Sequence, residues 1–167
     1  SEKWPVYYPD SLPPTVNIGT GSPTGICFGY RANFPQTYRD ALFICDWSFG
    51  KMYAVHLNPS GATYRAEVED FLTGVPLPLT DVVVNPRDGA MYFTTGGRNT
   101  QSGLYRLTHD AAGVAGGRPL AKGPDTTASA TVPAAAVRRR LEALHGRTTP
   151  TAVDTAWPYL NHQDRFV

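Results

Sequence analysis

The feature that most constrains the fold of this chain is a strand-rich pattern that occurs twice in tandem. The apolar stretch around Phe43 matches the stretch around Tyr92 at an offset of 49 residues, and the stretch around Tyr53 matches that around Tyr105 at an offset of 52. A four-stranded unit that repeats at about 50 residues is typical of the blades of a β-propeller. The alternative interpretation is an ordinary antiparallel sandwich that contains two similar hairpins.

The repeat predicts a mainly β chain. The expected strands of the first unit are residues 25–30, 41–46, 51–57 and 63–72, and those of the second unit are residues 80–84, 90–94 and 103–107. The predicted fold of residues 1–109 is therefore two antiparallel four-stranded propeller blades, with the fourth strand of the second blade supplied from elsewhere. Because a propeller closes with about four to eight blades, we expect these two to belong to a larger ring, of six blades.

The residues after the second unit predict a short helical tail. Residues 110–132 have the composition of a flexible linker, and residues 133–167 contain helical patterns. Pro133 and Pro150 each open a helical pattern, a position where proline is favoured. Asn161 and Asp164 have the spacing of a capping box and predict the start of a third helix. Since so little chain follows that start, we expect the sequence to be a piece of a longer protein.

Composition excludes several classes of protein. The 16 glycines and 15 prolines in 167 residues argue against a helical bundle or a coiled coil. The 15 Lys and Arg residues nearly balance the 14 Asp and Glu residues, which argues against nucleic acid or an anionic membrane as the main partner. No apolar run approaches the roughly 18 residues that a membrane span requires. Cys27 and Cys45 lack metal-binding spacing, so no metal site is predicted. They are interpreted as small hydrophobic strand residues or, alternatively, as a cross-strand disulfide.

Two long stretches resemble a known family. They are Asp40 to Leu57 (DALFICDWSFGKMYAVHL) and Pro76 to Arg106 (PLPLTDVVVNPRDGAMYFTTGGRNTQSGLYR). They are similar to the propeller of large secreted proteins of the planctomycete and verrucomicrobial type, known as haem-binding or membrane-bound dehydrogenase-like proteins. The tail resembles the junction at which that propeller passes into HEAT-like helical repeats.

The resemblance implies a function for the parent protein. It implies a propeller of the glucose/sorbosone dehydrogenase type, which uses pyrroloquinoline quinone (PQQ) and calcium to oxidise a sugar or an alcohol. Electrons would pass to a c-type haem domain elsewhere in the parent protein, in the periplasm or outside the cell. The partners of this chain would be the other blades, the helical repeats and that cytochrome domain. The alternatives are a non-catalytic module that binds glycans or proteins, and a purely structural scaffold. In each case we expect this chain alone to be inactive.

A propeller of this strand order would bring four loops to one face of the ring. These loops are residues 18–24, 46–49, 73–81 and 95–101. Arg98 follows two glycines, and its planar guanidinium suits the carboxylates of the implied quinone. The predicted cofactor-binding residues are Gly97, Arg98, Asn99 and Gln101. The alternative for Arg98 is a surface side chain in a flexible loop.

The same face carries the predicted substrate-binding residues. Asp46 is expected to accept a hydrogen bond from a substrate, Trp47 to stack on a sugar, and Asp81 to orient Arg98 or reach a cation. The alternatives are that Asp46 caps its own turn, that Trp47 packs between the blades, and that Asp81 caps a turn. Oxidation of a hydroxyl needs a general base, normally a histidine. The four histidines do not suit that role by position, so no catalytic residue is assigned to this chain.

Overall fold

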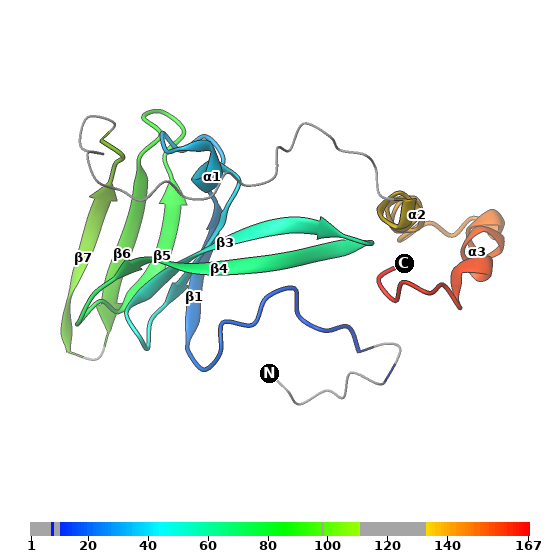
Figure 1. Cartoon of the computed structure of the whole chain (residues 1–167), viewed down its shortest axis with the longest axis horizontal. Coiled ribbons are helices and arrows are strands. Elements are labelled where there is room, and N and C mark those ends of the chain that lie inside the picture. Colours follow the sequence, from blue (N-terminus) through cyan, green and yellow to red (C-terminus); the bar gives the residue numbers. More distant parts are fainter. Residues whose placement is uncertain (1–7, 9–10, 98, 111–132) are drawn as a thin grey trace. The chain divides into compact units, whose positions relative to one another are not determined.

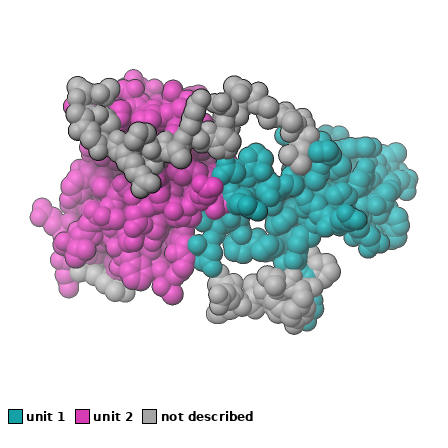
Figure 2. Space-filling model, viewed as in Figure 1, with its two compact units in different colours: residues 1–17, 58–65, 126–167 teal, residues 18–57, 66–125 magenta. Residues whose placement is uncertain are grey.

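The protein is described here from a computed structural model, which defines residues 8, 11–97, 99–110 and 133–167. The chain forms two compact units (Figure 2). Unit 1 contains Ser1–Asn17, Asn58–Arg65 and Thr126–Val167, and unit 2 contains Ile18–Leu57 and Ala66–Asp125. The prediction of a mainly β chain is confirmed.

Two antiparallel sheets form most of unit 2 (Figure 1). Sheet A has the order β1 (Pro23–Phe28), β2 (Leu42–Asp46), β3 (Lys51–Ser60) and β4 (Thr63–Thr73), with the short helix α1 (Gln36–Arg39) between β1 and β2. Sheet B has the order β5 (Leu79–Val84), β6 (Met91–Gly97) and β7 (Thr100–Leu107). The seven strands coincide with the seven expected stretches, with small differences at their ends.

The two sheets repeat each other residue by residue. The pair Ile44–Tyr53 in sheet A corresponds to Phe93–Tyr105 in sheet B, at the offsets of 49 and 52 residues seen in the sequence. The first strands of the two sheets also correspond, at an offset of 56 residues between β1 and β5. Ile26 pairs with Ile44 in sheet A, and its counterpart Val82 pairs with Phe93 in sheet B. Every pair that β2 makes with β1 and β3 has such a counterpart. The tandem repeat is therefore a repeat of strand register.

The core of unit 2 lies between the two sheets. The core face of sheet A comprises Cys27, Phe43, Cys45, Met52 and Ala54, and the core face of sheet B comprises Leu79, Val82, Met91, Phe93 and Tyr105. Most of these side chains are buried, and removal of their apolar area from water is the main force that holds the sheets together. The opposite sides are called the outer faces. Ile26, Phe28, Ile44 and Tyr53 belong to that of sheet A, and Thr80, Val83, Tyr92, Thr94, Leu104 and Arg106 to that of sheet B.

The first strands of the two sheets lie side by side and run parallel (Figure 1). The Thr24 hydroxyl donates to the Leu79 carbonyl at 2.9 Å. A Cβ atom on Gly25 would lie 2.5 Å from the Asp81 Cα, so only glycine allows this close approach. Beyond the far ends of both strands, the Asn33 N–H donates to the Gly89 carbonyl at 2.7 Å. Because these contacts advance in the same direction along both strands, the two sheets have the same orientation.

Unit 1 contains the helices α2 (Pro133–Glu142) and α3 (Pro150–Ala156), the 3₁₀ turn η1 (Trp157–Tyr159), and the tip of the β3–β4 hairpin. The prediction of a third helix after Asn161 is wrong. Asp164 instead accepts a hydrogen bond from the Ala62 N–H at 2.7 Å, and Arg138 donates to the Ala62 carbonyl at 3.1 Å. The Asp164 carboxylate, which the capping-box spacing predicts to start a helix, therefore holds the hairpin tip. Among the described residues, no helix combines the length and the apolar composition needed to cross a bilayer.

Candidate functional site

Four loops meet at one end of unit 2, which we call the loop end. It comprises residues 18–22, 47–50, 74–78 and 96–99, of which Arg98 is outside the described residues. The Trp47 N–H donates to the Ser22 carbonyl, the Gly74 N–H to the Gly50 carbonyl, and the Gly96 N–H to the Pro78 carbonyl, each at 3.0 Å. The structure therefore brings together the loops that the strand order predicts to share one face.

Asp46 lies at the loop end but is fully buried. Its Oδ1 atom accepts hydrogen bonds from the backbone N–H groups of Ser48 at 2.8 Å, Phe49 at 3.2 Å and Ser22 at 3.2 Å. Its Oδ2 atom has no hydrogen-bond partner among the described residues, and a Cβ atom on Gly21 would collide with it. Asp46 therefore caps its own turn, and the neighbouring loop keeps its free oxygen away from solvent.

Trp47 connects the two sheets. Its indole Nε1 donates to the Gly96 carbonyl at 2.8 Å, and a Cβ atom on Gly97 would lie 3.2 Å from the indole ring. Gly97 has a φ of 103°, which favours glycine. One side of the indole is thus occupied by the end of β6, as in the packing alternative that the sequence left open.

The other predicted residues are more dispersed. Asp81 lies at the irregular start of β5, and its Oδ1 atom accepts the Val82 N–H at 2.8 Å. Asn99 has a positive φ of 64°, and Gln101 is an exposed residue of β7. The predicted role of Arg98 stays a prediction, because this residue lies outside the described part of the chain.

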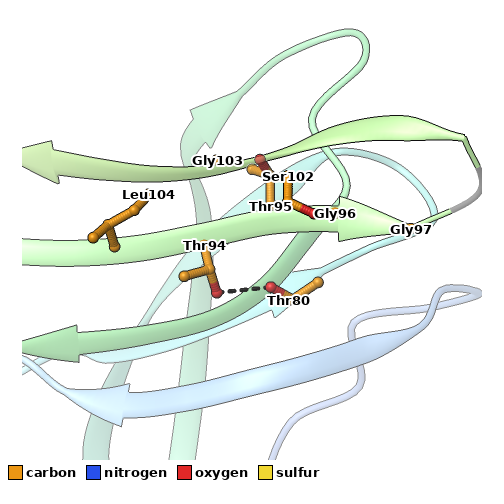
Figure 3. A pocket seen from close by; sticks show the side chains of 8 residues that line it. All are labelled: Thr80, Thr94, Thr95, Gly96, Gly97, Ser102, Gly103 and Leu104. Atoms are coloured by element: carbon orange, nitrogen blue, oxygen red, sulfur yellow. Dashed lines mark hydrogen bonds between the residues drawn. The ribbon is translucent and has the colours of Figure 1, made fainter.

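An open groove on the outer face of sheet B was not predicted (Figure 3). It has a volume of about 660 Å³ and is lined by Thr80, Thr94, Thr95, Gly96, Gly97, Ser102, Gly103 and Leu104. The Thr80 and Thr94 hydroxyls are hydrogen-bonded at 2.7 Å. Small polar residues have no distinctive sequence signature. The one usable signal was the run of threonines and glycines from Thr94 to Gly97.

The described residues of the loop end contain no side-chain cluster of the kind that holds a metal ion, and the predicted binding of a quinone stays a prediction. Within the described ranges, no group of three or more His, Cys, Asp or Glu side chains is arranged to hold a metal ion. Asp46 offers no accessible oxygen, and the Lys51 ammonium is paired with Asp70 at 2.7 Å. None of the four histidines belongs to the loop end; His56, for example, lies within β3 and contacts Glu69 at 3.2 Å.

Both cysteines are free thiols on the core face of sheet A. Burial raises the pKa of Cys27 to about 11, with a smaller contribution from the Asp81 carboxylate. Burial raises the pKa of Cys45 to about 12, with smaller contributions from Cys27 and Asp81. The thiolate is the reactive form, and these raised pKa values favour the protonated thiol near neutral pH, in agreement with the interpretation of both cysteines as small core residues.

In comparisons with known proteins, no family model, no curated protein and no solved structure matches this chain. The functional proposal therefore depends on the chain's own residues and on the motifs that resemble the dehydrogenase-like propellers.

Proposed function

We propose that unit 2 supplies two adjacent blades of a six-bladed β-propeller in a secreted or periplasmic protein of the quinoprotein dehydrogenase type. In this proposal the blades are a scaffold, and the chemistry belongs to other parts of the ring. The observation that carries the proposal is the identical strand register of sheets A and B, at one constant offset for each strand. Such a repeat is what tandem copies of one structural unit produce.

The way in which the two sheets meet favours a radial array over a sandwich. Phe43 on the core face of sheet A is equivalent to Tyr92 on the outer face of sheet B. The sheets are therefore packed front to back, whereas a sandwich with two-fold symmetry brings equivalent faces together. A front-to-back arrangement leaves one face at each end on which a further unit can pack.

The outer face of sheet B exposes apolar side chains, whereas that of sheet A is exposed along its edge strand β1 and buried at Ile44 and Tyr53. Val83 and Leu104 on the outer face of sheet B are 53% and 70% exposed, and Ile26 on that of sheet A is 60% exposed. Exposed apolar residues on the outer face of sheet B, in register with a buried interface, support the packing of a further blade on that side.

The reaction proposed for the parent protein rests on the resemblance of the motifs. In this reaction a sugar or an alcohol is oxidised with PQQ and calcium, and the electrons pass to a c-type haem domain. The structural uses of Asp46 and Trp47 support a scaffold role for these blades. A second candidate is a glycan- or protein-binding module. Phe49, which is 53% exposed at the loop end, and the hydroxyl-lined groove favour it.

Activity of the parent protein tests the proposal. The full-length protein that contains this chain should reduce an artificial dye when it is supplied with PQQ, calcium and a panel of sugars and alcohols. The chain of 167 residues should show no turnover under the same conditions. In the opposite result, the cofactor-loaded full-length protein reduces no dye with any compound of the panel and binds an immobilised glycan. This result would contradict the dehydrogenase proposal and favour the binding module.

A further inference from the structure

The two sheets have four edge strands, and three of them are protected against pairing with a further strand. β1 and β5 lie side by side, the pairing of each is irregular at its start, and β1 begins with Pro23. β4 is protected by charge, and its charged residues are Arg65, Glu67, Glu69 and Asp70. Irregular pairing, proline and charge are means by which natural sheets avoid association through their edges.

The fourth edge strand, β7, has much less of this protection. It pairs with β6 on one side, and no strand of the described residues pairs with its other side. Its sequence contains no proline, lysine or acidic residue, and its charged residue, Arg106, is paired with Asp88 at 3.3 Å. Every second residue of such an edge turns its N–H and C=O groups outward, where they can pair with another strand. β7 is therefore the open edge of unit 2.

Apolar side chains of β7 are exposed, whereas those of the equivalent strand in sheet A are covered. Met52 and Tyr53 in β3, which has a neighbouring strand on each side, are 0% and 9% exposed. Their counterparts in β7, Leu104 and Tyr105, are 70% and 49% exposed. A strand that pairs with the free edge of β7 would bury part of both side chains and gain the corresponding hydrophobic free energy.

We propose that β7 pairs with β7 of a second copy of this chain, antiparallel and across a twofold axis at Leu104. The comparison of the four edges identifies the occupant, because in a second copy β7 is again the edge that is open to pairing. A twofold contact joins identical surfaces and ends at the dimer. The inference goes beyond the proposed function, since it concerns association of this chain and needs no enzymatic activity.

A twofold axis at Leu104 makes the side chains of the two strands complementary. Leu104 faces its own copy on the outer face and forms an apolar centre. Tyr105 then faces Gly103, and Arg106 faces Ser102, so that a large side chain meets a small one in each pair. The Tyr105 ring already covers Gly103 of its own strand, where a Cβ atom would lie 2.7 Å from it. No charged residue faces a like charge, an arrangement that would destabilise the pairing.

Charge complementation across the twofold axis tests the proposal. In analytical ultracentrifugation and native mass spectrometry, the wild-type chain should form dimers as its concentration rises. Leu104→Lys and Leu104→Glu each place like charges opposite each other, so the dissociation constant of either variant alone should rise by at least about tenfold. A mixture of the two should recover a 1:1 heterodimer, because opposite charges then meet at the axis.

Val83→Lys is the matched control. Val83 lies on the same outer face as Leu104 and is 53% exposed, but it belongs to β5. This variant should therefore dimerise like the wild type, whereas it would block any packing of one outer face on another. Circular dichroism verifies that each variant is folded.

Hydrogen exchange of the wild-type chain is a second measurement that needs no substitution. The backbone N–H groups of residues 103–107 should exchange more slowly as the protein concentration rises, because some of them become paired across the axis. Unchanged exchange in β7, growth beyond the dimer, failure of the mixture to form a heterodimer, or loss of the dimer in Val83→Lys would each overturn the inference. So would a wild-type chain that is monomeric at all concentrations, which would leave the edge to the fourth strand that the sequence predicts from elsewhere in the parent protein.

Discussion

Sheets A and B have the same strand register but different surroundings, and their side chains differ accordingly. The core face of sheet A carries Phe43, Met52 and Ala54, all buried, where the outer face of sheet B carries Tyr92, Leu104 and Arg106. The register thus persists while the chemistry of equivalent faces diverges. Backbone pairing and side-chain packing are therefore specified separately. The pairing depends on the lengths of the turns and on the alternation of apolar and polar residues, whereas the packing depends on what covers each face of a sheet.

The largest effect that this comparison predicts comes from truncation of equivalent aromatic residues. Phe43→Ala removes a fully buried ring and should lower the free energy of unfolding by about 3–5 kcal/mol. Tyr92→Ala, at the equivalent and more exposed position, should cost about 1 kcal/mol or less. Denaturant unfolding measures both values. Equal losses would mean that the two faces are equally covered in solution, which contradicts the difference between the sheets.

A smaller effect is expected at the turns. Asp46 caps the β2–β3 turn of sheet A, and its counterpart in sheet B is Thr95. Asp46→Ala should destabilise the chain by about 2 kcal/mol, because three backbone N–H groups lose their acceptor. Asp46→Asn keeps an acceptor oxygen and should retain most of the stability. If both variants unfold like the wild type, Asp46 is not a structural cap and its assignment to substrate binding regains support.

The last effect is absent at neutral pH and concerns the thiols, which are present in sheet A only. The folded-state pKa values of Cys27 and Cys45, about 11 and about 12, lie above the ordinary value of 9.0. Since the folded chain holds these protons more tightly, the contribution is complete below pH 9 and is lost as the pH rises from 9 toward 11 and 12.

The measurement is the free energy of unfolding between pH 8 and pH 11. Cys27→Val with Cys45→Val removes the thiols and should give a shallower decline than the wild type. Cys27→Val introduces the residue that sheet B has at the equivalent position, Val83. Identical slopes would show that other groups account for the whole alkaline loss.

The strands could be predicted from the sequence because their signals are local. Alternating apolar residues and turn glycines such as Gly89, with a φ of 68°, define where each strand starts and ends. The capping-box pattern at Asp164 was misleading because its actual partner, Ala62, is 102 residues away. Separation along the sequence also hid the partner of Trp47, because its acceptor Gly96 is 49 residues away. The groove was missed because it depends on which face of a sheet stays uncovered.

The offsets between the two repeats also show where this chain tolerates changes of length. From Phe28 to Leu42, sheet A uses 7 more residues than sheet B uses from Val84 to Met91, and its β2–β3 connection is 3 residues shorter. No strand pair has shifted to accommodate these insertions and deletions. The connections therefore differ in length between the two sheets while the paired strands keep their register, so the length changes that separate the two repeats lie outside the paired positions.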